Sequence, residues 1–488
     1  MKKMKKLLSL VLSVAMVVAM GVTVFADTPN TCKITAPKTN HQYEIYQIFT
    51  GDLANGVLSN IKWGTNGKET AGEAVNKAVL DELTALDSKA NDRAKLNVIE
   101  KYAKLSNPVA TITNGETYTA AAGYYLIKDK DNTVSGTDSY TTYIVEVVGN
   151  TTITPKSDVP SFEKKVKDTN DTEGTTSDWQ DSADYDIGDE VTFKLEGTVG
   201  QKYADYKQYY FAFHDVEESG LTFNAKSVKV YVDNTNITDR DVYTVKKDNL
   251  TDGCTFEVIF NNLKNIPEVK AGSKIRVEYT STLNENAELG NTGNLNKAKL
   301  EFSNNPNADQ NGTKGETPWD NVIVFTYQAI VNKINATKQP LPGAEFTLAK
   351  KLKDGSTQNI TVVKSNNGTT FTFKGLDDGE YILTETTTPS GYNTIDPITF
   401  TVKADHTITW DGKNRTGVLT SLNGTEASGK ITFTANGDKS ELATDVVNKQ
   451  GSLLPSTGGI GTTIFYVIGG ILMVGAGVIL VSRRRRSK

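Results

Sequence analysis

Cysteine and histidine are scarce in this sequence, which has two cysteines and three histidines among its 488 residues. Two cysteines are too few for disulfides to stabilise a chain of this length. A disulfide between Cys32 and Cys254 is therefore an open alternative rather than the favoured interpretation. The cysteines and histidines show no clustered zinc-site spacing, and we therefore expect no metal and no cofactor.

The chain also lacks a large excess of charge of one sign and the usual catalytic patterns. The formal net charge is −5 and no basic patch stands out between the two ends, which argues against nucleic acid as a partner. The sequence shows no nucleophile–base constellation, no paired carboxylates in a glycosidase-like setting and no phosphate-binding glycine loop. We therefore do not expect an enzyme that acts on other molecules.

Long apolar runs stand at the two ends of the chain. Four lysines among the first six residues precede an apolar stretch at residues 7–24, which is typical of a secretory signal peptide, here cleaved between Ala26 and Asp27. Near the other end, residues 460–481 are apolar and long enough to span a bilayer, and four arginines at 483–486 favour the cytoplasmic side. Export of the chain should therefore stop at this segment.

A five-residue motif directly precedes the second apolar run, and it consists of Leu454, Pro455, Ser456, Thr457 and Gly458. The motif resembles the cell-wall sorting signal of Gram-positive surface proteins, in which a sortase cysteine cleaves between the positions matching Thr457 and Gly458. The alternative is an ordinary membrane anchor with a chance LPSTG, but the order of motif, apolar helix and arginines argues against it. The resemblance implies a secreted protein that is held briefly in the membrane and then anchored to the cell wall.

The body of the chain shows the alternation of β-strands. Segments 141–147, 190–195 and 274–279 alternate apolar and polar residues and are separated by Gly, Asn and Asp turns, as in antiparallel sandwiches. We therefore expect an all-β protein made of tandem Ig-like β-sandwich domains. One exception lies between residues 71 and 105, where an amphipathic helix is predicted to decorate the first domain; its apolar positions are Val75, Val79, Leu83 and Leu86.

Two segments look like domain boundaries. Residues 155–160 hold two prolines, which forbid a helix and favour an extended linker. A polar stretch at 304–318 precedes a strand at 321–329 that leads into a third domain. The predicted divisions are a signal peptide at 1–26, an N-terminal domain at 27–155, a middle domain at 156–318, a C-terminal domain at 319–452 and a sorting signal at 453–488.

In the third domain, two charged side chains and an amide are predicted to face the core. Strand periodicity puts Lys333, Glu385 and Asn448 on the apolar faces of their strands, where charges cost too much unless they neutralise or pair. Desolvation lowers the pKa of a lysine and raises that of a carboxyl. A neutral Lys333 amine can then attack the Asn448 carbonyl while a protonated Glu385 polarises that amide, which yields a Lys–Asn isopeptide bond. The alternative is that all three side chains are solvated.

The residues around Glu385 carry a family resemblance. Residues 381–392 read YxLxETxxPxGY and stand between the lysine strand and the asparagine strand, which is similar to the collagen-adhesin B-type domain. The resemblance implies that Glu385 is the E-box glutamate, Lys333 the first-strand lysine and Asn448 the final-strand asparagine.

The middle domain resembles the A-type collagen-adhesin sandwich of pilin backbones, on segments 162–166, 184–191, 213–221 and 295–302. The resemblance implies that Asp215 is the acid, and alternation selects Lys164 and Asn296 as its partners. The open alternatives are Lys165 for the lysine, Asn294 or Asn304 for the asparagine, and a simple turn role for Asp215.

The linker between the first two domains contains Lys156 directly after Pro155. This pair resembles the pilin motif of major pilins, which usually has an aromatic residue before Pro-Lys and often an asparagine after it, where this chain has Thr154 and Ser157. The resemblance implies that the Lys156 amine attacks the acyl-enzyme that sortase forms with Thr457 of another subunit. The alternative is a solvated linker lysine.

Segments 43–51 and 123–127 resemble strands of pilin N-terminal domains, and no third isopeptide triad is identified there. We therefore expect the first domain to be held by its hydrophobic core alone and to be the most labile of the three.

Taken together, the resemblances imply a major, backbone pilin of a sortase-assembled Gram-positive pilus that supports adhesion. The implied partners are a pilus-specific sortase, identical subunits in a covalent homopolymer, minor pilins, a housekeeping sortase, a peptidoglycan precursor and a host ligand that the sequence does not name. The alternative is a monomeric wall-anchored adhesin or stalk protein.

Overall fold

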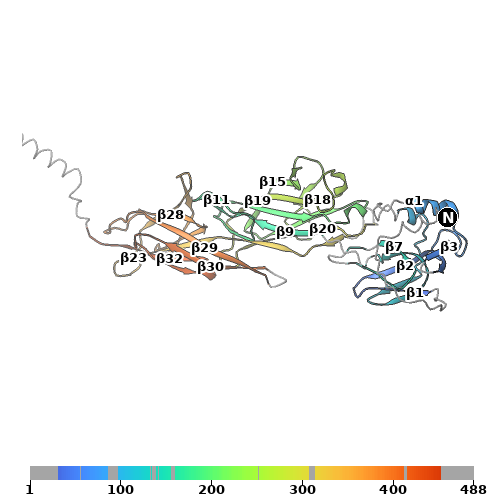
Figure 1. Cartoon of the computed structure of the whole chain (residues 1–488). Coiled ribbons are helices and arrows are strands. Elements are labelled where there is room, and N and C mark those ends of the chain that lie inside the picture. The colour runs from blue at the N-terminus through green and yellow to red at the C-terminus, as the bar shows by residue number, and fades with distance from the viewer. Residues whose placement is uncertain are drawn as a thin grey trace, which may run out of the picture.

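Three β-rich domains lie in a row, and the chain runs from the blue domain at one end to the orange and red domain at the other (Figure 1). The structure is a computed structural model and describes residues 31–54, 57–85, 97–131, 133–134, 139–140, 142–154, 160–250, 252–306, 314–410 and 415–451. The predicted signal peptide, Lys156 and the sorting signal lie outside these residues. No helix within the described ranges is long and apolar enough to cross a membrane.

The N-terminal domain is built from two sheets with a buried core between and beside them. The smaller sheet has the order β5 (Thr117–Ala121), β1 (Thr31–Thr35), β8 (Thr151–Thr152). The larger sheet has the order β3 (Val57–Trp63), β2 (Gln42–Ala54), β6 (Gly123–Asp129), β7 (Thr142–Val147), and β4 (Ala110–Thr113) also pairs with β2. Because β8 pairs with β1, the first domain includes residues up to the predicted linker.

The first domain carries a helix in the predicted stretch. Helix α1 spans Lys77–Ala85 within the described residues, and the amphipathic helix is predicted between residues 71 and 105. The side chain of Asn76 accepts a hydrogen bond from the main-chain nitrogen of Val79 at 3.0 Å and so caps the first turn. The chain before it turns at Gly72, whose φ of 91° is left-handed. Val75 and Val79 are buried, and Leu86 lies outside the described residues.

The middle domain is a sandwich of two sheets. One sheet has the order β12 (Ser182–Asp184), β22 (Asp320–Phe325), β20 (Asn294–Ser303), β14 (Phe211–Glu217), β18 (Phe256–Phe260), β17 (Thr244–Lys246), with β21 (Lys314–Glu316) paired to β20. The other has the order β16 (Thr235–Asn236), β15 (Leu221–Val232), β19 (Lys274–Leu283), β13 (Glu190–Thr198), β9 (Ser161–Val166). A small hairpin, β10 (Thr169–Asn170) and β11 (Thr175–Thr176), and two 3₁₀ turns, Tyr203–Asp205 and Leu263–Asn265, complete it.

The C-terminal domain is a second sandwich. Its first sheet has the order β26 (Val362–Lys364), β27 (Thr370–Leu376), β23 (Tyr327–Asn335), β32 (Glu441–Asn448), β31 (Phe433–Asn436). Its second has the order β25 (Thr357–Ile360), β24 (Glu345–Lys351), β28 (Gly379–Thr387), β29 (Ile398–Trp410), β30 (Arg415–Thr425), and a 3₁₀ turn spans Gly437–Lys439. The architecture confirms the prediction of an all-β chain of tandem sandwiches.

The boundary between the middle and C-terminal domains differs from the predicted one at 318/319. Strand β22 pairs with β20 and β12 in the middle domain, whereas β23 pairs with β27 and β32 in the C-terminal domain. Only Thr326 separates the two strands. The prediction was wrong because residues 321–329 read as a single strand, and alternation alone does not show where a chain passes from one sheet to the next.

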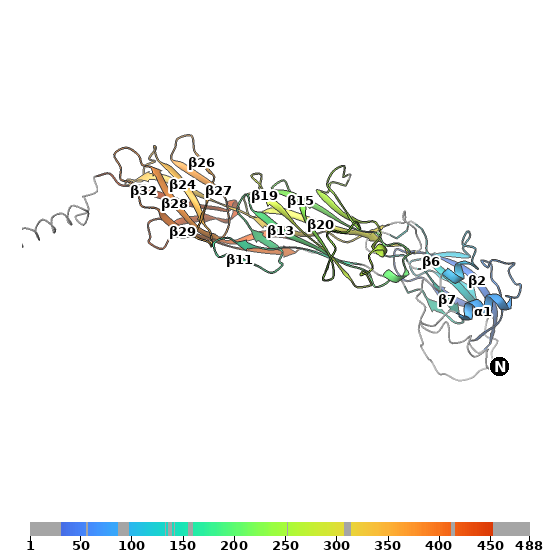
Figure 2. The same ribbon diagram turned by 90° about the horizontal axis from the view of Figure 1, so that it is seen from above.

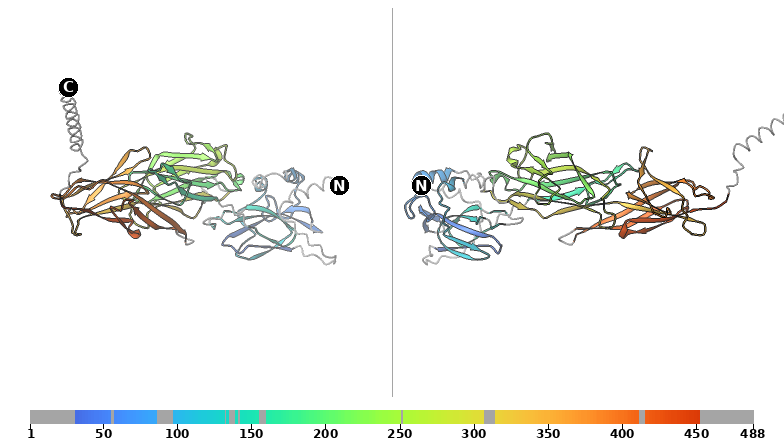
Figure 3. Two further views of the ribbon diagram at one scale, coloured as in Figure 1. Left: turned by 60° about the vertical axis from the view of Figure 1, so that its left-hand side comes forward. Right: turned by 180° about the vertical axis from the view of Figure 1, so that it is seen from behind.

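The middle and C-terminal domains abut in each view of the chain (Figures 2 and 3). Strand β12 of the middle domain contacts β29 of the C-terminal domain. At the other end of the middle domain, the main-chain nitrogen of Tyr140 donates to the carbonyl oxygen of Asn304 at 2.7 Å. The domain junctions therefore contain direct contacts as well as the connecting chain.

Candidate functional site

Lys333, Asn448 and Glu385 come together in the core of the C-terminal domain. Lys333 is on β23 and Asn448 on β32, and these first and last strands of the domain run parallel and side by side. Glu385 is on β28 in the facing sheet. Each of the three strands buries every second residue over this stretch, so the functional side chains share the inward face with apolar ones.

The contacts in this group are direct. The Lys333 Nζ atom donates to the Asn448 side-chain oxygen, and it lies 3.4 Å from Glu385 Oε1. The Asn448 side-chain nitrogen donates to both Glu385 oxygens, at 2.9 and 3.1 Å. The carboxyl group therefore lies against the amide nitrogen, and the amine lies against the amide oxygen. The side chains of Lys333 and Glu385 are fully buried.

Burial of the Lys333 side chain changes the pKa of its amine. Removal from water lowers the pKa of this amine, while the nearby Glu385 carboxyl opposes the shift. The Phe346 ring, with its centroid 5.7 Å from Nζ, forms part of the surroundings. A lowered pKa increases the fraction of neutral amine, which is the form that can attack a carbonyl carbon.

A second buried group stands in the middle domain, around Lys164 on β9. The Lys164 Nζ atom lies 2.5 Å from Asp215 Oδ2 and donates to the Tyr279 hydroxyl at 2.7 Å. The same hydroxyl donates to Asp215 Oδ2 at 2.8 Å. Desolvation lowers the pKa of Lys164 and raises that of Asp215, and their mutual attraction opposes both shifts.

Asn296 on β20 meets this group through the Tyr279 hydroxyl. Its side-chain nitrogen donates to that hydroxyl at 3.0 Å and to Glu217 Oε1 at 3.1 Å. The oxygens Asn296 Oδ1 and Asp215 Oδ1 are buried and have no hydrogen-bond partner among the described residues. Tyr279 and Glu217 were not predicted from the sequence. A signal existed for Glu217, because alternation puts it on the same face as Asp215.

The alternatives left open by the sequence lie elsewhere. Lys165 pairs with Asp181 at 2.7 Å in a partly exposed position. The Asn294 side chain bonds to main-chain atoms of Glu288 and Val324. The carbonyl oxygen of Asn304 takes part in the contact between the first two domains. Lys164 and Asn296 are the members of these sets that reach Asp215 and Tyr279.

The first domain offers no comparable group within its described residues. The buried polar and charged residues there are His41, Asn66, Asp129 and Ser139, and they include no lysine. His41 Nδ1 lies 2.8 Å from Asp129 Oδ1. Cys32 and Cys254 are both free thiols.

Comparison with known proteins matches two parts of the chain to family models. Residues 328–416 match the SpaA prealbumin-like fold domain, and residues 446–488 match the LPXTG cell wall anchor motif. The trypsin-resistant surface T6 protein of Streptococcus pyogenes serotype M6 is 28% identical over 437 residues, which cover 76% of this chain and 77% of that protein. This chain is therefore similar to a streptococcal surface protein over most of both lengths, and it carries the wall-anchor motif.

One solved structure supports the fold. The T6 backbone pilin of S. pyogenes, described as a modular three-domain structure, matches with a TM-score of 0.51 and 18% identity over 86% of this chain and 99% of that one. The full-length major pilin SpaD of Corynebacterium diphtheriae gives a TM-score of 0.48 and 19% identity over 86% and 97% of the two chains. The LPXTG match also places the chain at the Gram-positive cell surface, anchored to the wall.

Several predicted site residues lie outside the described residues. They are the pilin-motif lysine Lys156, the signal cleavage pair Ala26 and Asp27, and the sorting-motif residues Leu454, Pro455, Thr457 and Gly458. Their roles remain predictions from the sequence and from the family.

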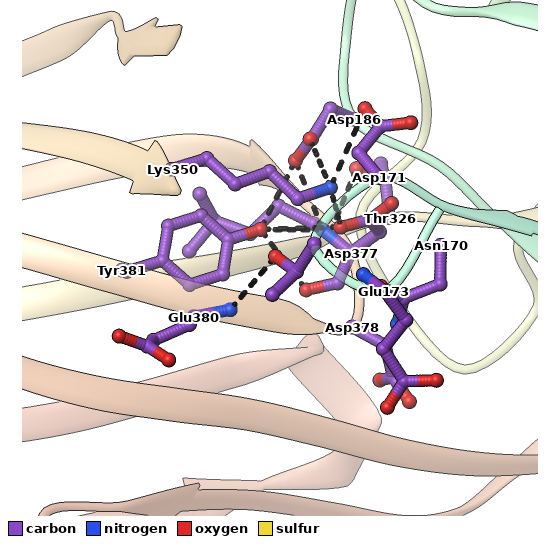
Figure 4. A network of polar contacts seen from close by, with 12 residues as sticks. Asn170, Asp171, Glu173, Asp186, Thr326, Lys350, Asp377, Asp378, Glu380 and Tyr381 are labelled. Atoms are coloured by element: carbon purple, nitrogen blue, oxygen red, sulfur yellow. Dashed lines mark hydrogen bonds and ion pairs between the residues drawn. The ribbon is translucent and has the colours of Figure 1, made fainter. Parts of the chain in front are cut away.

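A third buried lysine was not predicted from the sequence. Lys350 on β24 points between Asp186 of the middle domain and Asp377 of its own domain (Figure 4). The Tyr381 hydroxyl donates to Asp186 Oδ1 at 3.1 Å and so joins the same network. Here the two aspartates outweigh desolvation, and the pKa of Lys350 rises. Lys350 therefore stays charged and serves as an ionic contact between domains.

Proposed function

We propose that this chain is the backbone subunit of a sortase-assembled pilus and that its subunits are joined covalently, both internally and to one another. The observation that carries the proposal is the pair of buried lysines, Lys333 and Lys164, each set against a carboxyl group and close to an asparagine. The LPXTG anchor match, the similarity to the T6 surface protein and the fold shared with the T6 backbone pilin support it.

The proposed internal bond of the C-terminal domain joins the Lys333 nitrogen to the Asn448 side-chain carbon. The neutral amine attacks that carbon, the C–N bond of the amide breaks, and the amide nitrogen leaves as ammonia after taking up the one proton that the amine loses. Glu385 lies against the departing nitrogen and so is placed to pass a proton to it. Lys164, Asp215 and Asn296 play the corresponding parts in the middle domain, with Tyr279 between them.

The proposed bond between subunits joins the linker lysine of one subunit to the sorting motif of another. A pilus sortase cleaves between Thr457 and Gly458 and holds the Thr457 carbonyl as a thioester. The Lys156 amine of another subunit then displaces the enzyme thiol and forms an amide. A housekeeping sortase transfers the last subunit to a peptidoglycan precursor, and minor pilins join the same polymer, which supports adhesion to a host ligand.

Tandem mass spectrometry of pili taken from native cell walls tests the polymer directly. We expect a branched peptide in which Thr457 is amide-linked to Lys156. Detection of Thr457 linked to a different lysine would overturn the role of Lys156 while leaving polymerisation intact.

The alternative function is a monomeric wall-anchored adhesin that uses the same domains as a stalk. Denaturing gels separate the two functions, because a pilin gives a high-molecular-weight ladder and a monomeric adhesin does not. A ladder from the wild type that is lost with Lys156→Ala supports the pilin and its nucleophile. A wild type without a ladder supports the adhesin.

A further inference from the structure

The junction between the middle and C-terminal domains is rich in buried aspartates. In one part of it, Lys350 supplies the positive charge for Asp186, at 2.6 Å, and for Asp377 (Figure 4). A second group of aspartates stands beside this network and consists of Asp168, Asp184 and Asp378. No lysine occupies the centre of this second group in the described part of the chain.

The three aspartates of the second group come from separate segments. Asp168 follows β9, Asp184 ends β12, and Asp378 lies in the turn between β27 and β28. Possible ligand atoms of Asp168, Asp184 and His406, which is on β29, all lie within 4.8 Å of one another. The carboxyl groups of Asp184 and Asp378 interact directly. Two domains therefore contribute to one compact set of oxygen and nitrogen donors.

Two buried oxygens in this place have no hydrogen-bond partner among the described residues. One is Asp184 Oδ2, on a residue that is 4% exposed, and the other is the hydroxyl of Tyr327, which is fully buried. Burial is the main cause that raises the pKa of Tyr327, and the charges of Asp184, Asp378 and Asp168 and a contact with the Asp184 carboxyl add to it, which places the hydroxyl beside the group. Buried polar atoms are normally satisfied, and this contact does not reach hydrogen-bond geometry, so both oxygens have capacity for a further partner.

The charge balance points the same way. The neighbouring Lys350 pairs with Asp171, Asp186 and Asp377. None of the ion pairs between described residues includes Asp168, Asp184 or Asp378. The imidazole of His406 is oriented by the Ser182 hydroxyl, which lies 2.7 Å from its Nδ1.

We propose that this junction binds one divalent cation, held by the carboxylates of Asp168, Asp184 and Asp378, with His406 beside it. Carboxylate oxygens are the ligands that hard cations prefer, and an ion with two positive charges would offset the charges that these aspartates place in a low-dielectric site. The ion that fits is Ca²⁺ if the imidazole stays outside the coordination shell and Mn²⁺ if it enters. Because ligands come from both domains, the bound ion fastens one domain to the other.

Isothermal titration calorimetry tests the site on the mature chain after removal of metals with a chelator, with Ca²⁺ alone in one arm and Mn²⁺ alone in the other. We expect one saturable site with a dissociation constant below about 1 mM, the range of extracellular calcium modules. Asp184→Asn and Asp378→Asn keep the side-chain shape and should each weaken binding at least about tenfold. Asp396→Asn is the matched control, because its side chain is 90% exposed on the same domain, and it should bind as the wild type does.

The two arms also assign the ion. If Ca²⁺ binds and His406→Gln does not change its affinity, the site is supported and the imidazole lies outside the coordination shell. If Mn²⁺ binds and His406→Gln weakens its affinity, the site is supported and the imidazole lies inside the shell. Absence of saturable binding of either ion overturns the proposal, and the aspartates then share protons instead. Binding that is unaffected in both Asp184→Asn and Asp378→Asn overturns it as well. If Asp184→Asn does not fold, Asp378→Asn and the wild-type titration still decide.

Discussion

The Nζ atom of Lys350 in the C-terminal domain lies 2.6 Å from Oδ2 of Asp186 in the middle domain, and both side chains are fully buried. The same ammonium group contacts Asp377. The main-chain nitrogen of Asp377 also donates to Asp186 Oδ1, at 3.1 Å. One lysine thus connects a loop of one sandwich to a turn of the next, in a place that water does not reach.

Replacing Lys350 with Met should loosen this junction. The methionine fills a similar volume but leaves Asp186 and Asp377 buried without their cation, and loss of one partner of a buried ion pair costs about 3–5 kcal/mol. Calorimetry of the mature chain should show the melting transitions of the last two domains at lower temperature. The matched control is Lys351→Met, because Lys351 forms a solvent-exposed pair with Glu380 and should cost less than about 1 kcal/mol. Equal effects of the two variants would contradict the assigned role.

Replacing Glu385 with Ala should leave the C-terminal domain folded but without its proposed bond. Lys333 and Asn448 are 115 positions apart, and a crosslink that closes a loop of about 100 residues stabilises a protein by about 4–5 kcal/mol. Intact-mass spectrometry should show the mass of one more ammonia than in the wild type, with a lower melting temperature. Glu380→Ala, on the solvent side of the same strand, should keep the wild-type mass. The same ammonia loss with and without Glu385 would remove this residue from the mechanism.

Replacing Tyr279 with Phe should slow the bond proposed between Lys164 and Asn296. The hydroxyl contacts Lys164, Asp215 and Asn296, and hydrogen bonds to charged groups are worth about 1.5–3 kcal/mol each. We expect crosslinking at least about tenfold slower, followed by mass spectrometry over time after refolding. Tyr231→Phe, on the neighbouring strand β15, serves as the control and should crosslink at the wild-type rate. A wild-type rate in both variants would make Tyr279 a packing residue only.

The stability of the middle domain should fall as pH rises, because of Glu217. Burial and the adjacent Asp215 raise the pKa of Glu217 from 4.5 to about 8 in the folded domain, so the folded domain holds a proton that the unfolded chain has lost between these values. The free energy of unfolding then decreases by about 1.4 kcal/mol per pH unit between about pH 5 and pH 8. Glu217→Gln removes the titrating group and should flatten this dependence in thermal melts. Glu218→Gln, at an exposed neighbouring position, should keep it.

The sequence predicted the two lysine groups because strand alternation is local. Lys333 and Lys164 stand among inward apolar residues at spacings of two, and that spacing alone separates Lys164 from Lys165. Tyr279 escaped prediction because a tyrosine that alternates with Val277 and Ile275 reads as ordinary core. Its role depends on which strand faces it across the sandwich, and no local pattern encodes that.

The domain junction was beyond prediction for a different reason. Asp168, Asp184 and Asp378 come from three separate segments, and each alone reads as a loop or strand-end acid. Their proximity follows from the way two finished sandwiches meet at Thr326, where one strand passes directly into the next. The helix of the first domain was predicted from its apolar spacing, and Asn76, which caps its first turn, fixes where it begins.

The parallel pairing of β23 with β32 has a mechanical consequence. In the proposed pilus, tension would enter the C-terminal domain through its first strand and leave through its last, and Lys333 and Asn448 lie on these two strands within contact distance. With the proposed bond formed, a pulling force passes directly from one strand to the other and bypasses the chain between them. That intervening segment, which holds most strands of the domain, carries no tensile load and is free to vary in sequence without weakening the fibre.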